Sequence, residues 1–243
     1  MRQASIIAEL RARIAEVEGT TRRGAVCPFG VAAIDAQLPG GGLATGVLHE
    51  VAGSPELADD ACATIFLAGI LARLEGPVFW CLRWRDLFAP ALHLAGLHPD
   101  RVIHFEAGSD ANVLLAMEEC LRHGGLAGVV GEVAKYSTTA SKRLQLAAEG
   151  SGVTAFVFRR AAKLEIAGEG TAAVTRWRIA AAPSEPLGIP SLGRPRWQLA
   201  LERVRGGNPH QWIVEGCDAQ GRVGLSSALV DRPAAAEDHQ AAA

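Results

Sequence analysis

Residues Gly46-Val47-Leu48-His49-Glu50-Val51-Ala52-Gly53 form an apolar, β-like run that ends on glycine. A strong turn signal, Pro39-Gly40-Gly41-Gly42, precedes this run, and residues 59–74 beyond it carry Ala, Leu and Ile at helical spacing. The next apolar run, Val78-Phe79-Trp80-Cys81-Leu82, has the length of a buried strand. The sequence therefore predicts a strand that enters a tight turn, then a helix and a second strand, which together form a β-α-β unit.

The same alternation of strands and helices continues along the chain. Apolar residues with a period near 3.6 predict helices at residues 86–94, 111–122 and 139–149, and short apolar runs predict strands at residues 101–105, 126–133 and 153–159. This order favours an α/β fold with a mostly parallel central sheet and helices on both faces.

The pattern changes in the last third of the chain. Residues 174–179 and 197–202 alternate between apolar and polar side chains with a period of two. Arg205-Gly206-Gly207-Asn208-Pro209 then marks a hairpin turn before residues 211–215. We therefore expect antiparallel C-terminal strands to complete the sheet.

Composition indicates one globular domain. The chain has 243 residues, of which 49% are hydrophobic and 21% charged, so a sizeable core can form in a single α/β domain. The N-terminus lacks the apolar block of a secretory signal, and no stretch reaches the roughly 18 to 20 apolar residues of a membrane span. We expect a cytoplasmic protein that does not enter membranes. The formal net charge of −2 gives no overall attraction to nucleic acid, so contact with DNA would need a local basic patch.

Three segments make up the predicted domain organisation. Residues 1–23 read as an amphipathic helix and a linker, residues 24–232 as the α/β domain, and residues 233–243 as a low-complexity tail that we expect to be disordered. The helix has an apolar stripe that either packs on the core or binds another chain, and we take it as a candidate partner-binding surface: Ile6, Ile7, Leu10, Ile14 and Val17.

The loop after Gly53 lies where a phosphate-binding loop is expected. Such a loop reads G-x-x-x-x-G-K-[ST], in which backbone N–H groups hold phosphates, Lys neutralises them and Ser or Thr binds Mg²⁺. Counted from Gly53, the positions for Gly, Lys and Ser/Thr are Ala58, Asp59 and Asp60. No Lys or Arg occurs between Arg23 and Arg73 to replace the missing cation. The pattern predicts a degenerate loop that repels ATP, so we expect neither a nucleotide cofactor nor catalysis.

Several blocks of sequence resemble the ImuA family, the RecA-like proteins of inducible mutagenesis operons. The blocks lie between about residues 25 and 216, and the later ones are the more specific, because RecA-like ATPases such as RadA share the glycine turn. They are residues 29–43, 80–90, 96–101, 141–149 and 197–212.

This resemblance implies a RecA-like fold and an accessory role in the SOS response, in DNA-damage-induced mutagenesis and translesion synthesis. The implied partners are an ImuB-like homologue of Y-family polymerases and, indirectly, an error-prone C-family DNA polymerase. RecA, single-stranded DNA and a second copy of the chain remain open as further partners. Residues Cys81-Leu82-Arg83-Trp84 lack the catalytic Glu of an active RecA, whereas Glu132 resembles the carboxylate of a Walker B strand. Without the Lys and Ser/Thr of the loop, Glu132 alone cannot build a phosphoryl-transfer site.

Basic and tryptophan residues gather in the second half of the chain. They suit single-stranded DNA, through phosphate contacts and stacking, and equally a protein interface. The alternative is that the arginines mark a solvated sheet face and the tryptophans face the core. The candidate partner-binding or DNA-binding residues are Lys142, Arg143, Arg176, Arg178, Trp197, Arg203, Arg205 and Trp212.

Two other functions are compatible with the same patterns. One is a SulA-like inhibitor of cell division, which shares a RecA-like body without a working loop. The other is a RecA-like or RadA-like ATPase with an unconventional nucleotide loop. A hydrolase triad has no G-x-S-x-G motif to start from, and the five cysteines and the pair His93 and His98 lack metal-site spacing. We therefore expect no metal site.

Overall fold

A nine-stranded sheet organises the computed structural model, which describes residues 25–53, 56–160, 170–184 and 194–225. The strand order is β11-β10-β9-β8-β3-β7-β6-β4-β5. The parallel part consists of β3 (Leu48–Ala52), β4 (Val78–Leu82), β5 (Val102–Glu106), β6 (Gly128–Val133), β7 (Thr154–Arg159) and β8 (Thr175–Ala182). The predicted parallel core is confirmed, and β4 has the predicted bounds.

Antiparallel strands extend the sheet on one side, as predicted, but they begin one strand later than expected, because β8, which contains residues 175–179, runs parallel to β3. Strand β9 (Arg196–Val204) pairs with β8, β10 (His210–Glu215) pairs with β9, and β11 (Gly224–Leu225) pairs with β10. The turn between β9 and β10 is the hairpin expected from its glycines. A separate two-stranded sheet joins β1 (Val26–Cys27) to β2 (Leu43–Ala44), beside the short helix α2 (Ala32–Asp35).

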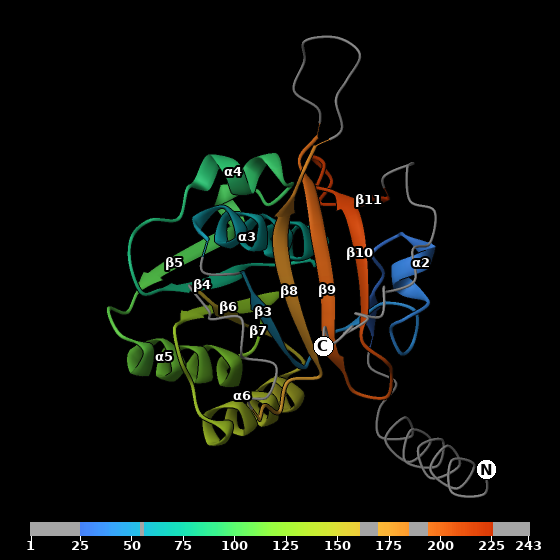
Figure 1. Cartoon of the computed structure of the whole chain (residues 1–243). Coiled ribbons are helices and arrows are strands. Elements are labelled where there is room, and N and C mark those ends of the chain that lie inside the picture. The colour runs from blue at the N-terminus through green and yellow to red at the C-terminus, as the bar shows by residue number, and fades with distance from the viewer. Residues whose placement is uncertain (1–24, 54–55, 161–169, 185–193, 226–243) are drawn as a thin grey trace, which may run out of the picture.

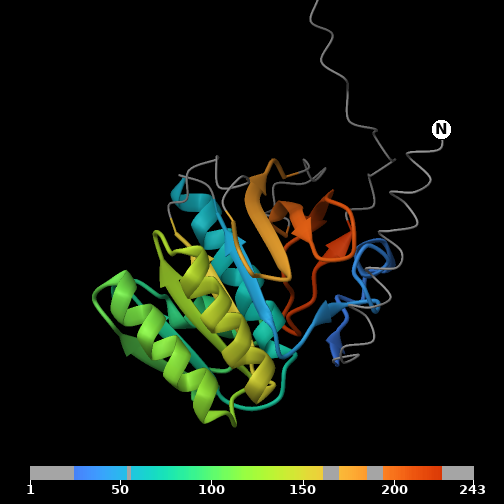
Figure 2. The same cartoon turned by 90° about the horizontal axis from the view of Figure 1, so that it is seen from below.

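Helices cover both faces of the parallel strands (Figures 1 and 2). One face carries α3 (Leu57–Ala72) and α4 (Ala89–Leu94), followed by a single 3₁₀ turn, η1 (Pro99–Arg101). The other carries α5 (Asp110–His123) and α6 (Thr138–Ser151). The expected helix at 86–94 is shorter than predicted because Pro90, which fits only the first turn of a helix, stands at the start of α4. Within the described residues, no helix is long and apolar enough to cross a membrane.

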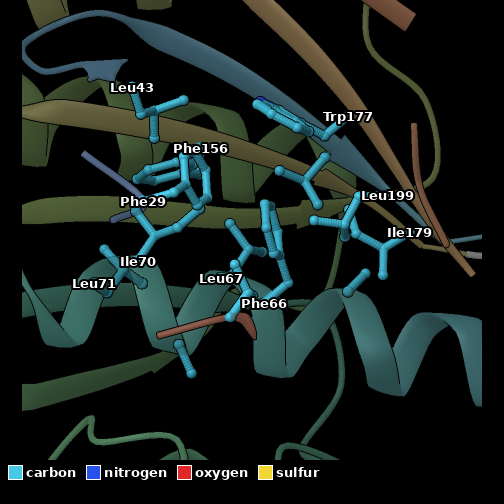
Figure 3. Packing of buried hydrophobic residues seen from close by; sticks show 14 of the residues in the cluster. Phe29, Leu43, Phe66, Leu67, Ile70, Leu71, Phe156, Trp177, Ile179 and Leu199 are labelled. Atoms are coloured by element: carbon cyan, nitrogen blue, oxygen red, sulfur yellow. The ribbon is translucent and has the colours of Figure 1, made fainter. Parts of the chain in front are cut away.

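Two hydrophobic clusters lie on opposite faces of the sheet because successive side chains of a strand point to opposite sides. In β7, Phe156 and Phe158 face α3, whereas Ala155 and Val157 face α5 and α6. Figure 3 shows the larger cluster, in which side chains of α3 meet those of β7, β8 and β9. Its centre is aromatic: the ring centroid of Phe66 lies 5.7 Å from that of Trp177 and 5.8 Å from that of Phe29. This packing fixes α3 against the sheet.

Candidate functional site

The carboxyl end of β3 brings the loop and the first turn of α3 into very close contact. A Cβ atom on Gly53 would lie 2.4 Å from Oδ1 of Asp60 and 2.7 Å from the backbone nitrogen of Asp60. Only glycine fits this approach between strand and helix. The glycine of a phosphate-binding loop is therefore retained with its structural role, and Asp60 stands against it in the first turn of α3.

Arg160, at the end of β7, collects three carboxylates at this edge of the sheet. Its Nη1 lies 2.7 Å from Oδ1 of Asp86 and 3.1 Å from Oε2 of Glu132, and its Nε lies 3.7 Å from Oδ2 of Asp60. Burial alone would lower the pKa of Arg160, but the hydrogen bond to Asp86 and the charge of Glu132 outweigh burial and raise it. The guanidinium is thus held charged, and we call Arg160, Asp60, Asp86 and Glu132 the Arg160 cluster.

Glu132 is the buried member of the Arg160 cluster. Its side chain is 2% exposed, and its Oε1 accepts a hydrogen bond of 2.8 Å from the indole N–H of Trp80. Burial raises the pKa of Glu132, while the positive charge of Arg160 and both hydrogen bonds oppose this shift. Both carboxylate oxygens are occupied by protein groups, so the carboxylate that resembles a Walker B residue has structural partners.

Two further contacts tie the loop to the neighbouring strand β8. Nη1 of Arg178 donates a 2.9 Å hydrogen bond to the carbonyl oxygen of Gly53, and its Nε donates to Oε1 of Glu202 at 2.6 Å. Oδ1 of Asp59 accepts from the backbone nitrogen of Ala181 at 2.7 Å. Asp59 therefore has a structural role that a Lys in its place could not perform.

The sequence predicted that no cation lies near Asp59 and Asp60, and the folded structure shows that this prediction is wrong. Arg160 reaches Asp60 from a residue 100 positions further along the chain. Since the carboxyl ends of parallel strands meet at one edge of a sheet, the basic end of β7 was the available signal. The cation is already engaged, because Arg160 carries one positive charge against three carboxylates. These four side chains together have a net charge of 1 − 3 = −2 when the carboxyls are ionised.

A second buried ionic cluster was not predicted. Glu50 of β3 lies 3.0 Å from Nε of Arg176 and 3.3 Å from Nη1 of Arg159, measured from its two carboxylate oxygens. Tyr136 packs on the same cluster, with its ring centroid 5.6 Å from Cζ of Arg159. Burial raises the pKa of the Tyr136 hydroxyl, which also shares a hydrogen bond of 3.0 Å with Thr171 Oγ1. Within the described residues, no group of three or more His, Cys, Asp or Glu side chains is placed to hold a metal ion.

Four of the predicted binding residues lie inside the protein, so their assignment to a binding surface is wrong. Arg176 is 1% exposed, because β8 is an interior strand between β3 and β9 and the Arg176 side chain pairs with the buried Glu50. Trp197 and Trp212 are buried in the larger hydrophobic cluster, the second with its ring centroid 6.1 Å from that of Trp177. Arg178 is mostly buried by its contacts with Gly53 and Glu202. The tryptophans face the core, whereas these arginines are not on a solvated face.

The other predicted binding residues are accessible. Arg205 and Lys142 are exposed and Arg203 is partly exposed, and Nη1 of Arg203 donates to the carbonyl oxygen of Thr171. Arg143, exposed on α6, forms an ion pair with Glu118 of α5. The stripe of Ile6, Ile7, Leu10, Ile14 and Val17 and the tail 233–243 lie outside the described residues. Arg203 lies in β9 and Arg205 directly follows that strand, whereas Lys142 and Arg143 lie on α6.

The chain is similar to known proteins in both sequence and structure. The sequence is 39% identical over 216 residues to Protein ImuA of Caulobacter vibrioides (strain NA1000 / CB15N), an alignment that covers 83% of this chain and 87% of that relative. Protein ImuA of Caulobacter vibrioides (strain ATCC 19089 / CIP 103742 / CB 15) matches to the same extent. No family model matches. The crystal structure of the RadB recombinase is similar in fold, with a TM-score of 0.60, 15% identity, and coverage of 82% of this chain and 99% of that chain. The fold is therefore RecA-like.

Proposed function

Since the chain belongs to the ImuA family, we propose that it is a non-catalytic RecA-like accessory protein of DNA-damage-induced mutagenesis. In this role it binds an ImuB-like homologue of Y-family polymerases and supports error-prone translesion synthesis by a C-family DNA polymerase. It acts in the cytoplasm as a binding protein. RecA, single-stranded DNA and a second copy of the chain are the further partners that this role allows.

The Arg160 cluster is the observation that carries the non-catalytic part of the proposal. A triphosphate at the start of α3 would meet carboxylates where a phosphate-binding loop supplies a Lys and a hydroxyl group. Two like unit charges about 5 Å apart repel by about 3 kcal/mol at an effective dielectric constant near 20. The net charge of −2 on the four side chains therefore opposes binding by several times the thermal energy, and Arg160 cannot turn to a phosphate without leaving Glu132 buried and charged.

Binding rather than catalysis also fits what is left accessible. Lys142, Arg143, Arg203 and Arg205 keep exposed or partly exposed basic side chains, whereas Gly53 and Asp59, on either side of the loop, are held by internal contacts. Basic side chains at a protein surface suit either an acidic partner surface or a nucleic-acid backbone. These four residues remain the candidates for partner or DNA contact.

A genetic experiment tests the role as a whole. The gene is deleted in its host strain, the frequency of ultraviolet-induced drug-resistant mutants is measured, and the deletion is complemented with the wild-type chain. We expect induced mutagenesis to fall in the deletion strain and to return on complementation, without filamentation of cells that overproduce the protein. Undiminished induced mutagenesis in the deletion strain would overturn the proposal, and filamentation on overproduction would favour an inhibitor of cell division.

The proposed interaction needs its own measurement. The full chain and the ImuB-like protein of the same genome are purified separately and titrated by biolayer interferometry. We expect saturable binding that survives the addition of a chelator and needs no nucleotide. An interaction that appears only with ATP and Mg²⁺ would contradict the non-catalytic assignment.

A further inference from the structure

Helices α5 and α6 lie side by side on the face of the sheet opposite α3 and α4 (Figures 1 and 2). Side chains of both helices line two hollows. One hollow of about 280 Å³ lies near the start of both helices, between Ala111 and Ala140. A second hollow of about 430 Å³ lies near their ends, between Arg122 and Ser151. Glu118 and Arg143 line both hollows, so the two hollows adjoin at this ion pair, and we call them together the α5–α6 groove.

Apolar side chains line the groove along its length. Leu114 and Leu144 line the first hollow and Ala147 the second. Two leucines of the groove remain exposed, Leu115 on α5 and Leu146 on α6, and 68% of the Leu146 surface is accessible. Large apolar side chains that line a concave surface and stay in contact with water are typical of a protein interaction site.

Charges at the middle of the groove select the kind of partner. Glu118 is buried, and its two carboxylate oxygens pair with Arg122 and Arg143 respectively. Both arginine side chains are more than half exposed, and each guanidinium has five N–H donors, so both keep donors for another carboxylate. Arg122 also lies 3.6 Å from the exposed Glu119. The groove thus presents two exposed guanidinium groups that the buried Glu118 holds in place.

The shape of the groove suits a helix. From Ala111 to Arg122 its α5 side spans eleven residue steps, which is about 16 Å, or about three turns of an α-helix. Amphipathic helices bind such grooves through apolar residues spaced three and four apart. Carboxylates beside those residues would form charge-assisted hydrogen bonds with the arginines.

We propose that the α5–α6 groove is a docking site for an acidic amphipathic helix of a partner protein. The apolar stripe of that helix packs on Leu115 and Leu146, and its carboxylates bind Arg122 and Arg143. This inference rests on the proposed function, because it gives the binding role a surface and a partner of defined chemistry.

Fluorescence anisotropy with synthetic peptides tests the groove without knowledge of the natural partner. The probe is a labelled peptide of about 15 residues with Leu at positions spaced three and four apart and Glu and Ala elsewhere, long enough to form a helix on binding. A peptide with Lys in place of Glu and a scrambled peptide are the controls. We expect the full chain to bind the acidic peptide about tenfold more tightly than either control. Equal binding of all three peptides would overturn the proposal.

Variants of the full chain locate the binding site. Leu146→Asp should weaken binding of the acidic peptide by about tenfold, and Arg143→Gln should weaken it by a similar factor while Arg122 still pairs with Glu118. The matched control is Leu94→Asp, because Leu94 is a leucine on α4, 73% exposed, on the opposite face. Leu146→Asp and Arg143→Gln variants that fold normally and bind like Leu94→Asp would overturn the assignment, as would sedimentation data showing that Leu146→Asp disrupts a dimer of this chain.

Measuring the binding of the ImuB-like protein tests this inference separately from the proposed function. If the wild-type chain binds it and Leu146→Asp binds it equally well, the groove assignment fails while the proposed function stands. If the wild-type chain does not bind it but binds the acidic peptide through Leu146, the groove assignment stands and the proposed function fails.

Discussion

Replacing Arg160 with Met removes the cation that Asp60, Asp86 and Glu132 share. Removing one partner of a buried ion pair costs about 3 to 5 kcal/mol, because the other charge stays buried without compensation. Glu132 is 2% exposed, but Arg160 is 21% exposed and Trp80 still donates its hydrogen bond to Glu132. We therefore expect the free energy of unfolding to fall by about 3 kcal/mol at neutral pH, near the lower end of that range.

Urea denaturation followed by tryptophan fluorescence measures this loss. With a denaturant slope near 3 kcal/mol per molar, the midpoint should fall by about 1 M urea. Arg85→Met is the matched control, since Arg85 is 87% exposed and its pair with Glu106 lies at the surface. Its effect should stay below about 0.5 kcal/mol.

A second substitution identifies the cause of the loss. Adding Glu132→Gln to Arg160→Met removes the buried charge and keeps an oxygen for the Trp80 indole, so it should restore about 2 kcal/mol. The account is refuted if Arg160→Met costs no more than Arg85→Met, or if Glu132→Gln lowers the stability of the Arg160→Met variant further.

The pH dependence of the Arg160→Met variant has a definite sign. Burial already raises the pKa of Glu132 above its ordinary value of 4.5, and loss of Arg160 raises it further. Between pH 4.5 and the folded-state pKa, the folded protein binds more protons than the unfolded chain, so stability falls as the pH rises through that interval. The deficit of the variant should thus be smallest at or below pH 4.5 and largest near neutral pH.

Three further substitutions test the packing of the loop and the buried polar groups. Gly53→Ala should lower stability by about 2 kcal/mol in thermal unfolding, because its Cβ would lie 2.7 Å from the backbone nitrogen of Asp60; Gly150→Ala, where nothing lies within 4 Å, should be neutral or stabilising. Burial lowers the pKa of His49 from 6.5 to about 4, so the stability that neutral His49 gives the fold is complete above pH 6.5 and is lost as the pH falls toward 4. The free energy of unfolding of the wild type should fall by about 3 kcal/mol over that range, and that of His49→Gln should fall less. Equal losses in the two proteins would contradict this prediction. Arg176→Met should lower the free energy of unfolding by about 3 kcal/mol, because Glu50 is buried beside Arg176. If the Arg176→Met protein were as stable as the wild type but bound its partner less well, Arg176 would be a surface binding residue after all.

Local patterns were sufficient to predict the frame of the fold. The apolar run of β4 was predicted residue for residue, and the glycines between β9 and β10 identified their hairpin, because burial and turn geometry depend on neighbouring residues. The identity of Ala58, Asp59 and Asp60 likewise predicted a loop without a phosphate-binding Lys.

Contacts between distant residues could not be predicted in this way. Arg160 and Asp60 meet because β7 pairs directly with β3, a neighbour relation that no local pattern contains. Arg176 lies in an alternating pattern, as an exposed side chain would, yet β8 is an interior strand and Arg176 is 1% exposed. Alternation indicates which residues share a face but not whether that face is open to water. The burial of Arg176 could be predicted only with knowledge of the strand order.

Isothermal titration calorimetry of the full chain with ATP and Mg²⁺ measures whether the loop after β3 holds a nucleotide. With carboxylates at Asp59 and Asp60 and Arg160 engaged by three carboxylates, we predict no saturable heat up to about 1 mM ATP, a concentration at which even a dissociation constant of 1 mM would be visible. The account would be contradicted if ATP bound saturably with a micromolar dissociation constant and Gly53→Ala weakened that binding. The chain would then be a nucleotide-binding RecA-like protein.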